Sequence, residues 1–85
     1  MVIYLDNNAT TQVDPDVLDA MLPYLSDLYG NPSSMHSFGG QVGAAIQSAR
    51  VQVANLLGAE DTEIIFNSCG SAGNNTALHA ALAAK

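Results

Sequence analysis

Two short apolar runs, far apart in the sequence, most constrain the fold of this chain. Residues 2–5 (VIYL) and residues 62–66 (TEIIF) are rich in β-branched and aromatic side chains, which favour β-strands. Residues 6–8 (DNN) end the first run, because Asp and Asn favour turns. Two strands with helical segments between them predict an α/β fold, and two short strands alone cannot complete a sheet that is covered on both faces.

A first helix is predicted directly after the loop that follows residues 2–5. Asp14 is a suitable N-cap, and Pro15 stands at the first helical position, where its missing N–H costs nothing. Apolar residues at helical spacing extend this pattern over residues 15–28. Pro23 lies inside the pattern and should kink or shorten the helix, because proline removes a hydrogen bond and clashes with the preceding turn.

Two further helical patterns complete the predicted order β-α-α-β-α. The second has apolar side chains on one face at positions 42, 46, 49, 53 and 56, and Gly58 should end it as a C-cap. We expect this helix to be the longest. The third should run to Lys85, with a buried stripe formed by Ala77, Leu78, Ala81 and Leu82.

Small residues dominate the loop before the third helix, residues 66–75 (FNSCGSAGNN). Such a loop between a strand and a helix can bind an anion, because the first N–H groups of a helix lack intrahelical partners and the helix dipole is positive there. From spacing alone, an ordinary capped helix start without a ligand is the commoner interpretation, since short glycine motifs are weak signals.

Charge and composition exclude several classes of partner. The formal net charge is −6, with eight acidic residues against only Arg50 and Lys85, which argues against nucleic acid and anionic membranes. One cysteine, Cys69, cannot form an internal disulfide, and no spacing suggests a metal site. No leader pattern or membrane-length apolar run is present, so we expect a soluble, cytoplasmic protein.

Four motifs in this order closely resemble the N-terminal part of the NifS-type cysteine desulfurases. They are residues 4–11 (YLDNNATT), residues 30–34 (GNPSS) with His36, residues 49–50 (AR) and residues 66–71 (FNSCGS). The resemblance covers essentially the whole chain. The SCG sequence at 68–70 is more similar to the nitrogen-fixation branch than to the housekeeping branch.

The resemblance implies a fold and an activity. The fold would be the N-terminal portion of a fold-type I transferase of the class V aminotransferase family, dependent on pyridoxal 5'-phosphate (PLP). Residues 1–14 would be its N-terminal strand and active-site-facing loop, and residues 15–85 the start of its large PLP-binding domain. The homodimeric enzyme would remove sulfur from L-cysteine, giving alanine and an enzyme persulfide, and pass the sulfur to an iron-sulfur scaffold.

Site residues follow from the same resemblance. Gly70 and Ser71 stand where the family places its phosphate-binding pair, a small residue followed by threonine, and serine keeps the hydroxyl donor. Four residues of the N-terminal loop would shape the substrate end of the pocket, although Asn and Thr in such loops commonly only cap and turn the chain. They are Asn7, Asn8, Thr10 and Thr11.

The phosphate loop also departs from the family pattern. Asn67 replaces a usual threonine, and Ala72 replaces a glutamate in the first helical turn. A carboxylate there stabilises a helix by up to about 1 kcal/mol, so its loss weakens the helix start without removing the phosphate donors. The effect of the sequence at residues 72–74 (AGN) on the site stays open.

No residue of this chain is predicted to be catalytic. His36 should make structural hydrogen bonds, and His79 has less claim to a role in chemistry. Cys69 could be activated at a helix N-terminus, but the family's persulfide cysteine lies on a far C-terminal loop, so packing is the preferred interpretation. Lys85 matches nothing in the family's Schiff-base lysine motif.

The chain alone should therefore be inactive, and we expect it to need the remaining desulfurase chain. It could belong to a truncated gene, a split enzyme or a longer polypeptide. Two alternatives remain: a non-catalytic module that pairs with a desulfurase, and a domain that only binds phosphate.

Overall fold

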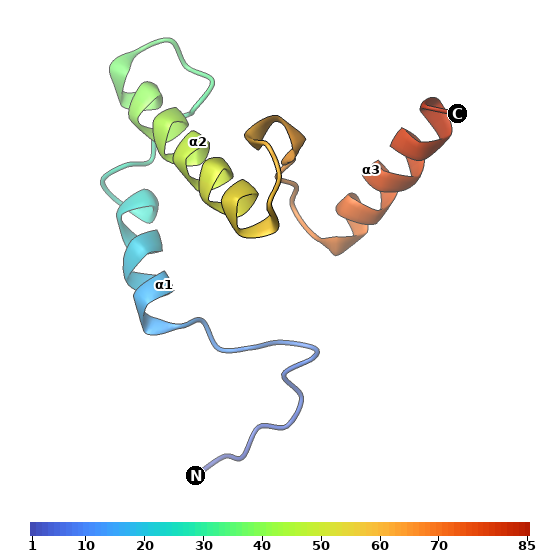
Figure 1. Cartoon of the computed structure of the whole chain (residues 1–85). Helices are drawn as coiled ribbons and strands as arrows, with labels where there is room; N and C mark the ends of the chain where they lie inside the picture. Colours follow the sequence, from blue (N-terminus) through green and yellow to red (C-terminus); the bar gives the residue numbers. More distant parts are fainter. The chain divides into compact units, whose positions relative to one another are not determined.

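The computed structural model describes residues 1–85, whose regular structure is entirely helical (Figure 1). The chain divides into two compact units, Met1–Gln47 and Ser48–Lys85. In chain order the elements are α1 (Pro15–Met21), the 3₁₀ helix η1 (Leu22–Leu25), α2 (Ser37–Leu57), the 3₁₀ helix η2 (Asp61–Glu63) and α3 (Gly70–Ala83).

The structure contains neither predicted strand, so the order β-α-α-β-α is not confirmed. Residues 2–5 have no regular structure, and part of the second run forms η2 instead. Ile64 is locally extended, with φ −100° and ψ 124°. Extended backbone becomes a strand only when a neighbour supplies the ladder of hydrogen bonds, and neither segment has one.

The start of α1 confirms the prediction for Asp14 and Pro15, while its end comes earlier than predicted. The backbone N–H of Asp16 donates to Asp14 Oδ1 at 2.8 Å, and Pro15 opens the helix. The α-helix stops at Met21 rather than at residue 28, and the chain continues as η1. Pro23 explains the change, because it has no N–H for the α-helical hydrogen bond.

Helix α2 is the longest element and ends where predicted. Gly58 follows it with φ +69°, the left-handed conformation that glycine adopts without strain. Four of the five apolar residues predicted on one face are half-buried, whereas Leu56 is exposed. The helix therefore has the predicted face, but the cover over that face is incomplete.

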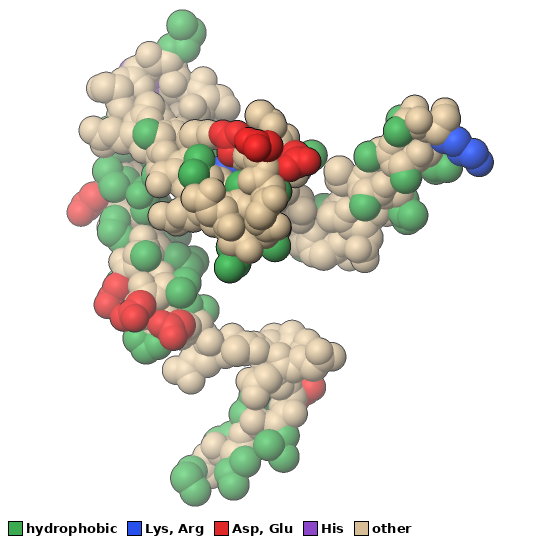
Figure 2. All heavy atoms as spheres, viewed as in Figure 1, with side chains coloured by type: hydrophobic (Ala, Val, Ile, Leu, Met, Phe, Trp, Pro, Cys, Tyr) green, Lys and Arg blue, Asp and Glu red, His purple; other side chains and the backbone are tan.

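Helix α3 ends at Ala83, two residues before Lys85, and its predicted stripe is not buried. Leu78 is 64% exposed and Leu82 is 69% exposed. Only Gly39 and Ala54 are buried in the whole chain, and hydrophobic side chains lie widely over the surface (Figure 2). An amphipathic helix buries its stripe only against another layer, and these residues supply none for α3.

Membrane-crossing helices are absent. None of the helices combines enough length with enough apolar character to span a bilayer.

Candidate functional site

The start of α3 leaves backbone donors without acceptors. Cys69 is the N-cap, in an extended conformation, and its side chain makes no capping hydrogen bond. The first helical bond runs from the Gly73 N–H to the Cys69 carbonyl at 3.0 Å. The N–H groups of Gly70, Ser71 and Ala72 therefore have no backbone acceptor at the helix start.

Space around Gly70 is open. A Cβ placed on Gly70 would meet no atom within 4 Å, and its φ is not positive, so neither crowding nor backbone conformation requires glycine here. Gly70 and Ser71 are both exposed. Three N–H groups without backbone acceptors, the Ser71 hydroxyl and the helix dipole form a donor set that fits a phosphate group.

Asn67 organises the loop that leads into α3, a role that sequence reasoning missed. Its Oδ1 accepts the Cys69 N–H at 3.1 Å, which closes an Asx turn just before the helix. Its Nδ2 would lie 3.2 Å from a Cβ placed on Gly73, so glycine at that position makes room for the Asn67 side chain. The signal was available, since Asn two residues before an N-cap is typical of an Asx turn.

The Cys69 thiol is exposed, which contradicts the expectation that it packs, because no layer of this chain covers it. The Ala72 N–H lowers the pKa of this thiol most, followed by the Ser68 hydroxyl, whose oxygen lies 3.8 Å from Sγ. The Ser71 N–H adds a smaller lowering, and desolvation partly opposes them. The helix start thus favours negative charge, although the thiol itself makes no capping hydrogen bond.

Arg50 joins α2 to residues 64–66, which lead toward α3. The half-buried side chain donates from Nη1 to the Ile64 carbonyl, and its guanidinium carbon lies 5.0 Å from the centroid of the Phe66 ring. Sequence reasoning identified Arg50 only as part of a motif. A contact across 14 residues depends on how the chain folds back, which no local pattern reveals.

The N-terminal loop makes local turn contacts. The Ala9 N–H donates to the Asp6 carbonyl at 3.0 Å, and the Thr11 hydroxyl donates to the Asn7 carbonyl at 2.8 Å. The Thr10 hydroxyl shares a hydrogen bond with the Tyr4 hydroxyl. All four predicted pocket residues are exposed, including Asn8, and their role toward a substrate stays a prediction.

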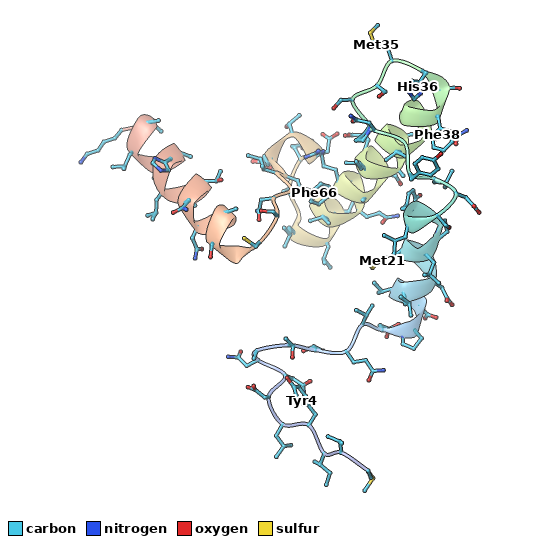
Figure 3. The ribbon with its side chains drawn as sticks, turned by 180° about the vertical axis from the view of Figure 1, so that it is seen from behind. Tyr4, Met21, Met35, His36, Phe38 and Phe66 are labelled. Carbon is cyan, nitrogen blue, oxygen red and sulfur yellow. The ribbon has the colours of Figure 1, made fainter.

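His36 has the structural role that was predicted. Its Nδ1 accepts the Gly39 N–H at 3.2 Å, and its carbonyl accepts the Gly40 N–H at 3.0 Å, so it caps the start of α2 (Figure 3). His79 is exposed on α3. The chain contains no group of three or more His, Cys, Asp or Glu side chains that could hold a metal ion.

Comparison with known proteins identifies the family. The family model described as aminotransferase class V matches residues 3–85, and the chain belongs to this family. Its fold class is therefore that of the fold-type I enzymes, in which PLP-dependence is a family property.

Close relatives are cysteine desulfurases, which confirms the resemblance drawn from the motifs. The chain is 75% identical over 84 residues to "Cysteine desulfurase 2" of Trichormus variabilis, covering 99% of this chain. It is 67% identical over 84 residues to a cysteine desulfurase of Nostoc sp., again with 99% covered. Identity to "Cysteine desulfurase NifS" of Azotobacter vinelandii is 56% over 84 residues, with 98% covered.

The chain spans about a fifth of the length of these relatives, since each alignment covers 21% of the relative. No solved structure gave a significant match.

Proposed function

We propose that this chain is the N-terminal segment of a PLP-dependent cysteine desulfurase, which takes sulfur from L-cysteine and releases alanine. The observation that carries the proposal is the high identity to cysteine desulfurases over nearly the whole chain. The free donors at the start of α3 support it, because they lie where the family places its phosphate-binding pair.

In this proposal the start of α3 holds the cofactor phosphate. Ser71 donates its hydroxyl and its N–H, and the N–H groups of Gly70 and Ala72 complete the contact, with the helix dipole favouring the phosphate charge. Gly70 lets the phosphate approach the backbone closely. When bound, PLP supplies an electron sink for chemistry at the amino-acid carbon atoms. The chain's own task is to fix the phosphate end of the cofactor.

The N-terminal loop is proposed to shape the substrate end of the pocket. The turn held by the Asp6 carbonyl and the Thr11 hydroxyl gives the loop a defined local shape. Residues 1–14 would form this active-site-facing segment, and residues 15–85 would begin the large PLP-binding domain. The pocket-shaping residues remain Asn7, Asn8, Thr10 and Thr11.

Partners of the complete enzyme belong to the same proposal. The widely exposed apolar side chains support the remaining desulfurase chain as the first partner, because such surfaces are seldom left open to water. A second subunit and an iron-sulfur scaffold in the cytoplasm follow from the resemblance to desulfurases of the nitrogen-fixation branch. Alone, the 85 residues should form neither the Schiff base nor the persulfide.

A chimaera tests the proposal. In this protein, called the chimaeric desulfurase below, the chain replaces the corresponding residues of the Trichormus variabilis relative, to which it is 75% identical. We expect the chimaera to show the visible absorbance of bound PLP and to form alanine from L-cysteine. The unaltered relative is the control. A chimaera that unfolds at the same temperature as the cofactor-free relative but binds no PLP would contradict the proposal.

A further inference from the structure

We propose that Arg50 is a positioning residue for the phosphate site at the start of α3. This inference rests on the proposed function, because it assumes that Gly70 and Ser71 hold the cofactor phosphate. Arg50 would not contact the phosphate. It would act through residues 64–66, the segment that leads into the phosphate loop.

Arg50 contacts this segment at two points. Its guanidinium donates to the Ile64 carbonyl and lies over the Phe66 ring, with 5.0 Å between the guanidinium carbon and the ring centroid. A planar guanidinium can form a directed hydrogen bond and stack on a ring at the same time, which a lysine ammonium cannot do. The two contacts therefore fix both the position and the orientation of residues 64–66 relative to α2, within the unit Ser48–Lys85.

Phe66 affects the start of α3 through the residue that follows it, Asn67. Asn67 is the next residue, and its side chain both accepts the Cys69 N–H at 3.1 Å and lies against Gly73 in the second turn of the helix. Gly70 follows Cys69. A rotation of residues 64–66 would therefore change where the free N–H groups of Gly70 and Ser71 point.

The test compares two ligands in the chimaeric desulfurase: PLP, and pyridoxal, which lacks the phosphate. Arg50→Met keeps the apolar stem and removes the guanidinium, and with it the hydrogen bond to Ile64 and the cation–π contact with Phe66. We expect it to raise the Kd for PLP about tenfold, the order expected when one hydrogen bond to a charged group is lost. The Kd for pyridoxal should change by less than about twofold, since only the phosphate contact is misplaced. Arg50→Lys should resemble Arg50→Met.

A control variant and a milder variant complete the design. Gln52→Met alters an exposed residue of the same helix and should leave both dissociation constants unchanged. Phe66→Leu removes only the ring contact and should raise the Kd for PLP less than Arg50→Met does, which keeps the test informative if the arginine variants fold poorly. Equal weakening of both ligands, or no weakening of either, would overturn the inference. The proposed function fails separately, if the unsubstituted chimaera binds no PLP.

Discussion

The starts of α2 and α3 differ in how the chain treats their free N–H groups. At α2, His36 accepts the Gly39 N–H through Nδ1, and the preceding loop packs closely around Gly39. At α3, the N-cap Cys69 makes no capping hydrogen bond, and nothing lies within 4 Å of a Cβ placed on Gly70. The start of α2 is therefore capped by a side chain of the same chain, whereas the start of α3 has no side-chain cap.

The two helix starts differ in whether the packing around them requires glycine. At Gly39 a Cβ would clash with the Asn31 carbonyl and would lie 2.9 Å from the Ser34 Cβ, so the fold itself requires glycine. The ring of Tyr29, before this loop, packs against the ring of Phe38 in the first turn of α2, with 5.1 Å between their centroids. At Gly70 a Cβ would meet nothing within 4 Å, so the fold imposes no such requirement.

Gly39→Ala should have the largest effect on stability. Its methyl group would force the loop at 31–34 away from α2, and overpacking of this kind costs about 1–3 kcal/mol. The thermal midpoint of the chimaeric desulfurase should fall. Gly40→Ala is the matched control, because a Cβ there meets nothing within 4 Å and alanine favours a helix over glycine by about 1 kcal/mol. If Gly39→Ala and Gly40→Ala changed the thermal midpoint equally, close packing around Gly39 would not be what requires glycine there.

Gly70→Val should spare stability and weaken cofactor binding. The side chain would enter open space, so the free energy of unfolding of the cofactor-free chimaera should stay within about 0.5 kcal/mol of the parent, as for other surface changes. Crowding of the bound phosphate should raise the Kd for PLP about tenfold, as measured by fluorescence titration. A valine variant that binds PLP as the parent does would show that Gly70 is not close to the phosphate.

His36→Ala should destabilise the start of α2 by about 1 kcal/mol, the usual cost of losing an N-cap acceptor. Hydrogen exchange at the Gly39 amide measures this directly and should become faster. His36→Asn keeps an acceptor at the N-cap and should recover most of the protection. If both variants exchange alike, the imidazole does not act as the cap.

The smallest expected effect is a shift in the pH dependence of the rate at which the Cys69 thiol is alkylated. Because the helix start lowers the thiol pKa, iodoacetamide should react at half its maximal rate at a lower pH than with free cysteine. The stabilised thiolate contributes to folding above the unfolded thiol pKa, and this contribution is lost as the pH falls through the folded pKa. Mass spectrometry of the Cys69 peptide gives the profile.

Ala72→Pro provides the control for this profile. Proline removes the N–H that lowers the Cys69 pKa most, in a first turn where proline is tolerated, so the midpoint should rise toward that of free cysteine. An unchanged midpoint would rule out the Ala72 N–H as the cause. Cys69→Ser should keep sulfur transfer in the chimaera, because the persulfide cysteine of the family lies elsewhere.

Local signals in the sequence predicted local structure correctly. Asp14 with Pro15 begins α1, Pro23 shortens it, and Gly58 ends α2, because each acts through its own backbone or its nearest neighbours. The strand predictions at 2–5 and 62–66 failed because a strand depends on a partner strand. The prediction of a buried stripe on α3 also failed, because a helix face is buried only when a second layer covers it.

In the candidate site, too, local features could be predicted from the sequence and contacts between distant residues could not. The open helix start at Gly70 and Ser71 follows from a glycine motif before a helical pattern, so sequence could propose it. The bond from Arg50 to the Ile64 carbonyl joins residues 14 positions apart and became visible only in the structure. Family resemblance supplied the identity of the anion, which the chain's own chemistry leaves general.

The Kd for PLP in two serine variants of the chimaeric desulfurase tests the phosphate assignment most directly. Ser71→Ala removes a hydroxyl donor at the open helix start, and Ser68→Ala removes one that lies beside the Cys69 thiol instead. We predict that Ser71→Ala raises the Kd about tenfold, as expected for a hydrogen bond to a charged group, and that Ser68→Ala leaves it unchanged. Equal Kd values for the two variants would contradict the assignment of the phosphate to the start of α3.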